Sequence, residues 1–238
     1  MDFNPTPPGI RLAAAPLSDA GRLPSTWLGP LERERAAAYG AGAPRLRFTA
    51  GRLLARSLAA SLLSVPPEDV GIANDCPLCG PGAHGRPVLL LRGVQVPASF
   101  SLTRAAAWIL VAVGPPAMRL GVDLAEPADA AFSEGHNRGG LDELSFGAAE
   151  RAALASLPPR DRPRERARLW ALKEALGKAL GEGIAGPDGI PSVEGVGAHP
   201  ALLAPGAVKW SPPSGSAGLP RELVSGAVLL PPSAGPRA

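Results

Sequence analysis

The stretch from Leu169 to Gly183, LWALKEALGKALGEG, decides how this chain folds. At about 100° per residue, one helical face is an ordinary apolar core face, made of Leu169, Leu172, Leu176, Ala179 and Leu180. The opposite face carries an aromatic residue, two small residues, an acid and a base, namely Trp170, Ala171, Gly177, Glu174 and Lys178. Glycine costs about 1 kcal/mol in a helix interior and tryptophan seeks burial, so a merely solvated face would rarely hold them. We therefore expect a helix that is covered on both sides.

Glu174 and Lys178 stand one helical turn apart, and the residues leave two interpretations open. A plain ion pair of this spacing stabilises a helix by roughly 0.2–0.5 kcal/mol and has no further role. The tryptophan and glycine beside it favour a functional acid and base on a covered face.

The same residues carry a resemblance to a known family. The pattern W-x-x-K-E-A-x-x-K-A-x-G-x-G is similar to the signature of the 4′-phosphopantetheinyl transferases, and every element of it is present from Trp170 to Gly183. A second signature of that family, G-V/I-D followed by an aliphatic residue, matches Gly121 to Leu124. Weaker matches extend the resemblance over residues 45–184.

Asp123 lies among apolar residues in an expected strand from Leu120 to Leu124. A buried carboxylate is costly unless it is paired or binds a metal, which favours a functional role for it. The family often has a second carboxylate two residues later, where this chain has Ala125. Glu126 is displaced by one position, and on a regular strand its side chain would point to the opposite face.

The N-terminal part offers arginines to a phosphate-bearing ligand. A helix is expected from Pro44 to about Leu63, with Arg45, Arg52 and Arg56 along one side. These arginines form either a solvated basic face or, as the resemblance to the family's first helix implies, contacts to the 3′-phosphate of coenzyme A.

Two further segments resemble coenzyme A contacts of the family. Gly85-Arg86-Pro87 is similar to a Gly-Lys/Arg-Pro turn, in which Arg86 would approach the nucleotide. At the family's N-x-S-H-S motif, Thr103 keeps a hydroxyl and Arg104 replaces the histidine. Arginine binds a diphosphate through two hydrogen bonds but does not titrate near neutral pH, so any role of an imidazole is called into question. Alternatively, Arg104 is simply a charge at a strand end.

The resemblance implies an α+β fold, a pseudo-dimer of two similar α/β halves. We place the halves at residues 1–114 and 115–238, because Gly114-Pro115-Pro116 interrupts the chain. It also implies Mg²⁺-dependent transfer of the phosphopantetheine arm of coenzyme A to a serine of an acyl or peptidyl carrier protein, with release of adenosine 3′,5′-bisphosphate. The larger, pseudo-dimeric members activate carrier proteins of peptide and polyketide synthases in secondary metabolism, and we expect a monomer.

Three residues would carry this chemistry. Asp123 and Glu174 are the carboxylates expected to hold Mg²⁺, which prefers a few carboxylates together with phosphate oxygens and waters. Lys178, helped by Arg104, would stabilise charge on the leaving diphosphate. The attacking serine needs a base, which is either Glu174 itself or a water held by the metal.

Two other classes of function compete with this one. A non-catalytic coenzyme A-binding homologue is the main alternative, with Ala125 and Arg104 as marks of lost chemistry. A nucleic-acid surface is disfavoured, because the net charge is only +3 and aromatic residues, 4% of the 238, do not alternate with the arginines. No apolar run reaches about 18 residues and no signal peptide opens the chain, so we expect no membrane contact and a cytoplasmic protein.

The rest of the chain supports only general expectations. Residues 1–30, rich in Pro, Gly and Ala, should drape over the surface with little function, residues 127–140 should form a mobile loop, and residues 231–238 should be disordered. Cys76, Cys79 and His84 lack a fourth ligand nearby, so a structural or free thiol pair is favoured over a zinc site. Strands are expected at 88–91, 108–113, 207–210 and 223–230.

Overall fold

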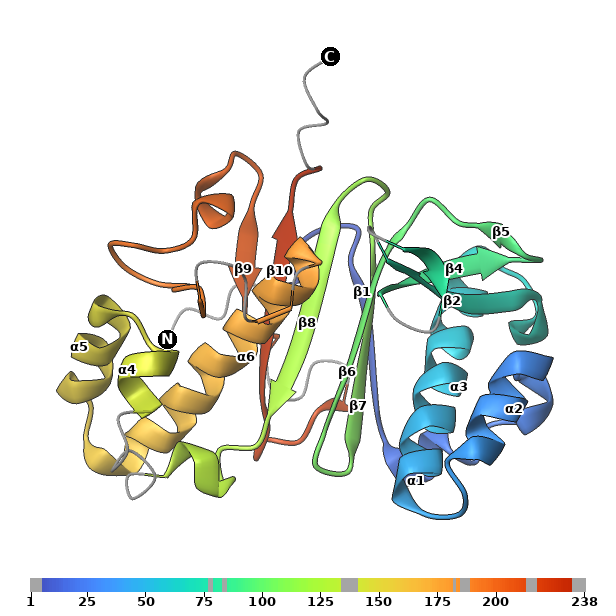
Figure 1. Cartoon of the computed structure of the whole chain (residues 1–238), viewed down its shortest axis with the longest axis horizontal. Coiled ribbons are helices and arrows are strands. Elements are labelled where there is room, and N and C mark those ends of the chain that lie inside the picture. The colour runs from blue at the N-terminus through green and yellow to red at the C-terminus, as the bar shows by residue number, and fades with distance from the viewer. Residues whose placement is uncertain are drawn as a thin grey trace. The chain divides into compact units, whose positions relative to one another are not determined.

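The computed structural model describes residues 6–76, 79–82, 85–133, 141–181, 183–184, 189–212 and 218–232. Its contacts divide the chain into two compact units (Figure 1). The N-terminal unit is formed by Gly9–Pro116, and the C-terminal unit mainly by Ala117–Ser216 and Pro220–Ala238. Each unit contains both helices and strands, so the expected α+β character is confirmed. Within the described ranges, the helices are too short or too polar to cross a membrane.

The N-terminal unit combines helices with two antiparallel sheets. Its elements are β1 (Arg11–Pro16), α1 (Leu17–Ala20), α2 (Pro30–Ala38), α3 (Ala43–Leu63), β2 (Val70–Cys76), β3 (Gly80–Gly82), β4 (Arg86–Leu91), β5 (Val94–Gln95), β6 (Ser99–Ala105) and β7 (Trp108–Gly114), with single 3-10 turns at Ser25–Trp27 and Pro67–Asp69. One sheet has the strand order β1-β7-β6 and the other β3-β2-β4-β5.

The core of this unit lies between α3 and the β1-β7-β6 sheet. The central strand β7 reads WILVAVG and is buried from Ile109 onward, as its continuous apolar run predicts. Helix α3 packs on it through small residues such as Ala50, Ala55 and Ala59, all of them buried. Pro44 lies in the first turn of α3, where its missing N–H costs nothing, and Ser64 ends the helix in a left-handed conformation.

The N-terminal residues correct one expectation. Residues 1–30 were expected to lie over the surface, but Arg11–Pro16 forms β1 and pairs with β7 along its whole length. Ile10, Leu17 and Leu28 are buried. This segment is therefore part of the core. The strand was missed because Leu-Ala-Ala-Ala has low intrinsic β-propensity, and pairing with β7 decides its conformation.

The C-terminal unit consists of one sheet and the helices that cover it. Its elements are β8 (Arg119–Ala125), α4 (Leu141–Ser145), α5 (Ala148–Ser156), α6 (Arg162–Leu180), β9 (Val208–Trp210) and β10 (Val224–Leu230), with 3-10 turns at Ala130–Phe132, Pro159–Asp161 and Pro200–Leu203. The sheet is antiparallel with the order β8-β10-β9. Helix α6 lies across β8 and β10 (Figure 1).

Helix α6 is covered on both faces, as its sequence predicts. The apolar face is buried, with Leu169, Leu176 and Ala179 fully inaccessible. The second face is covered as well, since Ala171 and Gly177 are buried and Glu174 is half-buried. The helix starts eight residues before the signature, at Arg162, and is followed by Gly181 in the left-handed conformation that favours glycine.

The two units share a connection pattern that the sequence did not reveal as a repeat. In each three-stranded sheet the last strand lies in the middle, giving β1-β7-β6 and β8-β10-β9, and a long helix follows the first strand. In each unit the helix before the long one begins at a glycine whose N–H donates to a glutamate three residues on, Glu32 in α2 and Glu150 in α5. Both glutamates then pair with a cation on the long helix, Arg56 or Lys173.

Candidate active site

Asp123 and Lys178 form the centre of the candidate site in the C-terminal unit. Asp123 lies near the end of β8 with its side chain 11% exposed, and Lys178 lies in the last turn of α6. The Lys178 Nζ donates to Asp123 Oδ1 at 2.6 Å and to the carbonyl oxygen of Val122 at 3.1 Å. The buried carboxylate is therefore paired, which removes most of the cost of its burial.

Two glycines bring α6 close enough for this contact. A Cβ at Gly121 in β8 would overlap the backbone of Ala175, and a Cβ at Gly226 in β10 would overlap the backbone of Ala171. Gly226 is also the direct cross-strand partner of Asp123. The helix backbone thus rests directly on the sheet beside Asp123, an approach that any larger residue would prevent.

Glu174 lies one helical turn before Lys178 and is half-buried. Burial raises the pKa of Glu174 above its ordinary value, the negative charge of Asp123 raises it further, and the Lys178 ammonium opposes both effects. A carboxylate with a raised pKa is better suited to accept a proton near neutral pH than an ordinary glutamate.

The donor atoms around Asp123 fit a hard divalent cation. Asp123 and Glu174 offer carboxylate oxygens whose charges repel each other, and a cation, the Lys178 ammonium, is already held by two oxygens there. Within the described residues no group of three or more acidic, histidine or cysteine side chains gathers. Two carboxylates suit Mg²⁺, which keeps several waters and takes further oxygens from a phosphate substrate.

Ala125 lies in an apolar environment. Its side chain packs with Ala167, Ala171 and Val224, and β8 keeps a regular register with β10 through residue 125. Glu126 follows the strand and is exposed. No bulge in β8 therefore brings Glu126 to the face of Asp123.

Lys173, next to Glu174, is a fully buried cation to which we gave no role from the sequence. Its Nζ lies 2.7 Å from Glu150 Oε2 and donates to the carbonyl of Pro191 at 2.6 Å. Glu150 also accepts from the backbone N–H of Gly147 and of Val193. This network ties α6 to α5 and to the segment at 191–193. The signal was present, because Lys173 falls between Leu169 and Leu176 on the core face, where a charge requires a buried partner.

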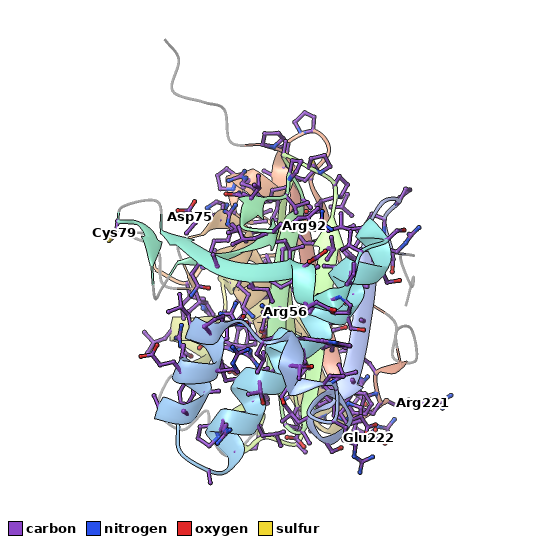
Figure 2. All side chains as sticks on the ribbon, turned by 90° about the vertical axis from the view of Figure 1, so that its right-hand side faces the viewer. Arg56, Asp75, Cys79, Arg92, Arg221 and Glu222 are labelled. Carbon is purple, nitrogen blue, oxygen red and sulfur yellow. The ribbon has the colours of Figure 1, made fainter. Side chains whose placement is uncertain are left out.

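The arginines expected to bind the nucleotide lie in the N-terminal unit and differ in environment. Arg45 is exposed on α3, whereas Arg52 and Arg56 are buried against Glu32 of α2. Arg56, labelled in Figure 2, is 3% exposed. The alternative of a solvated basic face is thus wrong for Arg52 and Arg56.

Arg52 is held by neighbours on several sides. It donates to the carbonyl of Ile72 at 3.0 Å, lies 3.8 Å from Glu32 and stacks over the ring of Phe48. Burial lowers the pKa of Arg52 to about 10; Glu32 opposes this, and nearby arginines, with Arg104 the largest contributor among them, add to the lowering. Its guanidinium therefore contributes positive charge to its surroundings while its hydrogen bonds stay within the protein.

Arg104, at the end of β6, packs against α3. A Cβ at Gly51 would overlap its guanidinium, so the glycine of the R-F-x-A-G-R segment makes room for this side chain. Burial lowers the pKa of Arg104, and its Nε has no hydrogen-bond acceptor in the described part of the chain. The structure therefore brings Arg104 near Arg52 and concentrates positive charge beside α3.

The other expected contacts lie elsewhere in the same unit. Thr103 is buried in β6, and Arg86 is half-buried at the start of β4, opposite Asp75 of β2. The tip of the β2–β3 hairpin carries the exposed Cys79 (Figure 2). The side chain of Cys76, His84, the segment 134–140 and residues 233–238 lie outside the described residues, so the expectations for them stay predictions.

Comparison with known proteins bears on the C-terminal unit. No curated protein shows a match to the chain. A family model matches from the start of β8 to the 3-10 turn before β9, a stretch of about a third of the chain that includes Asp123, Glu174 and Lys178. The resemblance inferred from the two signatures is confirmed at this level: residues 119–201 match the 4′-phosphopantetheinyl transferase superfamily.

Proposed function

We propose that this chain transfers the 4′-phosphopantetheine arm of coenzyme A to a serine of a carrier protein. The observation that carries the proposal is the group of Asp123, Glu174 and Lys178, which α6 and β8 bring together inside the segment that matches the superfamily. Carrier domains of peptide or polyketide synthases are the proposed acceptors.

The reaction forms one bond and breaks one. The serine oxygen bonds to the phosphorus that bears the pantetheine arm, and the P–O bond to the neighbouring phosphate breaks. The electron pair leaves with adenosine 3′,5′-bisphosphate. Glu174 takes the serine proton, directly or through a water.

The chain supplies the electrostatic part of catalysis. Asp123 and Glu174 are the residues proposed to hold Mg²⁺, which when bound would neutralise the diphosphate and polarise the phosphorus. The Lys178 ammonium stabilises the charge that develops on the leaving phosphate. Lys173 acts on Glu174 through the helix: its buried pair with Glu150 fixes the rotation of α6 and so the direction of the next side chain.

The N-terminal unit is proposed to contribute the nucleotide contacts. Arg45, Arg86, Thr103 and Arg104 are the residues proposed to contact phosphate oxygens, and Arg52 would add positive charge. The matching strand orders and helix starts of the two units support a pseudo-dimeric architecture, in which one chain contains both halves and acts as a monomer.

The test is carrier loading. The protein is incubated with coenzyme A, Mg²⁺ and an apo carrier domain, and the intact mass of the carrier is measured. We expect the mass to increase by one phosphopantetheine and the increase to disappear with chelator or with Asp123→Asn. Binding of coenzyme A without any loading of several carrier domains would instead identify a non-catalytic coenzyme A-binding protein.

A further inference from the structure

The contact between Lys178 and Asp123 places an internal cation at the expected metal position. The Lys178 ammonium is held by a carboxylate oxygen of Asp123 at 2.6 Å and by the Val122 carbonyl at 3.1 Å. Glu174, the second carboxylate, feels the charges of both residues. Two oxygens and a nearby second carboxylate are also what a hard divalent cation takes from a protein.

Lys178 is not required to hold the helix in place. The close packing at Gly121 and Gly226 and the buried pair of Lys173 with Glu150 already fix α6 on its sheet. The Lys178 side chain is 31% exposed, whereas Lys173 is fully buried. A lysine ammonium is a point charge on a flexible four-carbon stem, so it can leave Asp123 when another partner is offered.

We propose that Lys178 is a built-in counter-ion that occupies Asp123 in the metal-free protein and is displaced when metal and a diphosphate bind together. The inference rests on the proposed function of the same site. Metal alone has to displace Lys178 from Asp123 without giving it a new partner. A diphosphate supplies that partner, because its oxygens accept the ammonium that the metal displaces.

This arrangement couples metal binding to binding of the diphosphate. Breaking the ion pair between Lys178 and Asp123 costs free energy when the metal binds alone. The new contact between the Lys178 ammonium and the diphosphate offsets that cost when both ligands bind. Typical couplings between two ligand sites correspond to about 5- to 150-fold in affinity and are equal in both directions. The apolar setting of Ala125 adds to the effect, because among the described residues two carboxylates, Asp123 and Glu174, attract the metal before the diphosphate arrives.

The test measures binding of Mn²⁺ by the electron paramagnetic resonance signal of the free ion, with and without coenzyme A and with no carrier present. Lys178→Met removes the internal cation and keeps much of the side-chain volume. Lys209→Met is the matched control, because it removes the same charge from the same unit at a side chain that pairs with Glu194 and not with Asp123. Asp123→Asn reports whether the metal uses this site.

We expect Lys178→Met to bind Mn²⁺ alone about tenfold more tightly than the parental protein, and coenzyme A to strengthen Mn²⁺ binding less in this variant than in the parental protein. Lys209→Met should behave as the parental protein. Mn²⁺ should also raise the thermal midpoint of Lys178→Met more than that of the parental protein, because the variant lacks the ammonium that competes with the metal for Asp123. If Lys178→Met folds poorly, Lys178→Gln, which keeps a hydrogen-bond donor without the charge, takes its place.

Equal or weaker Mn²⁺ binding by Lys178→Met would overturn the counter-ion role while leaving the proposed metal site intact. Binding that Asp123→Asn does not reduce, or an absence of binding in every protein even with coenzyme A, would overturn the metal site and with it this part of the proposed function. The two failures are therefore distinguishable.

Discussion

Replacing Lys173 by methionine should destabilise the C-terminal unit by about 3–5 kcal/mol, the usual cost of removing one partner from a buried ion pair. The side chains of Lys173 and Glu150 are both fully inaccessible, and the Nζ–Oε2 distance is 2.7 Å. Methionine fills the space but leaves the Glu150 carboxylate without a counter-charge and the Pro191 carbonyl without its donor.

The structure also limits the loss. Glu150 keeps its hydrogen bonds from the N–H groups of Gly147 and Val193, at 2.8 and 2.7 Å, which continue to stabilise the negative charge. Hydrogen bonds to charged groups contribute about 1.5–3 kcal/mol each, so we expect a value in the lower part of the range. Domains are stable by about 5–15 kcal/mol, and the variant should therefore fold while unfolding at much lower urea concentration.

The assay is urea unfolding followed by circular dichroism and tryptophan fluorescence. Arg160→Met is the control, since Arg160 is 85% exposed and lies 3.8 Å from the exposed Asp161, so removing its charge should cost no more than about 1 kcal/mol. Adding Glu150→Gln to Lys173→Met should restore part of the loss, because the unpaired charge is removed together with its partner. A cost below about 1 kcal/mol for Lys173→Met, or a double variant as unstable as the sum of the two single ones, would refute the buried pair as an anchor of α6.

Three further predictions concern the two candidate sites. Because burial raises the pKa of Glu174 above its ordinary 4.5, the metal-free protein should lose stability as the pH rises through that raised pKa. Glu174→Gln should therefore have a higher melting temperature than the parental protein near about pH 8 but not near about pH 4. Equal melting temperatures of the two proteins at both pH values would contradict this prediction. Gly226→Ala should lower the free energy of unfolding in urea by about 1–3 kcal/mol and reduce carrier loading, because the new Cβ meets the rigid backbone of Ala171. An unchanged urea midpoint would mean that α6 does not rest on the sheet at Gly226. Neutralising Arg45 and Arg86 should weaken binding of coenzyme A far more than of dephospho-coenzyme A by calorimetry, whereas equal losses would argue against a 3′-phosphate contact.

Helix α6 and strand β8 were predictable because their information is local. The apolar residues at helical spacing from Leu169 to Ala179 predict the buried face, and the signature residues predict that Glu174 and Lys178 share the other face. The run from Leu120 to Leu124 predicts a strand with Asp123 inside it. The superfamily match over residues 119–201 contains the residues that carried this interpretation.

The contacts between distant segments were decided by the tertiary structure. The sequence predicted Lys178 as a ligand of phosphate, but only the packing of α6 on Gly121 and Gly226 brings its ammonium to Asp123, 55 residues away. In the same way, the sequence is compatible with a solvated face for Arg56, whereas in the structure Arg56 pairs with Glu32, 24 residues earlier.

Strand β1 and the matching strand orders of the two units were also decided by tertiary packing and not by the local sequence. Leu12-Ala13-Ala14-Ala15 has no strong strand preference of its own, and it becomes extended because β7 offers a complete row of backbone hydrogen-bond partners. The matching sheet orders are likewise properties of pairing and are not visible as repeated letters. A chain's own periodicity determines which face of an element is apolar, whereas the partner of a buried charge or of an edge strand depends on long-range packing that the local sequence does not encode.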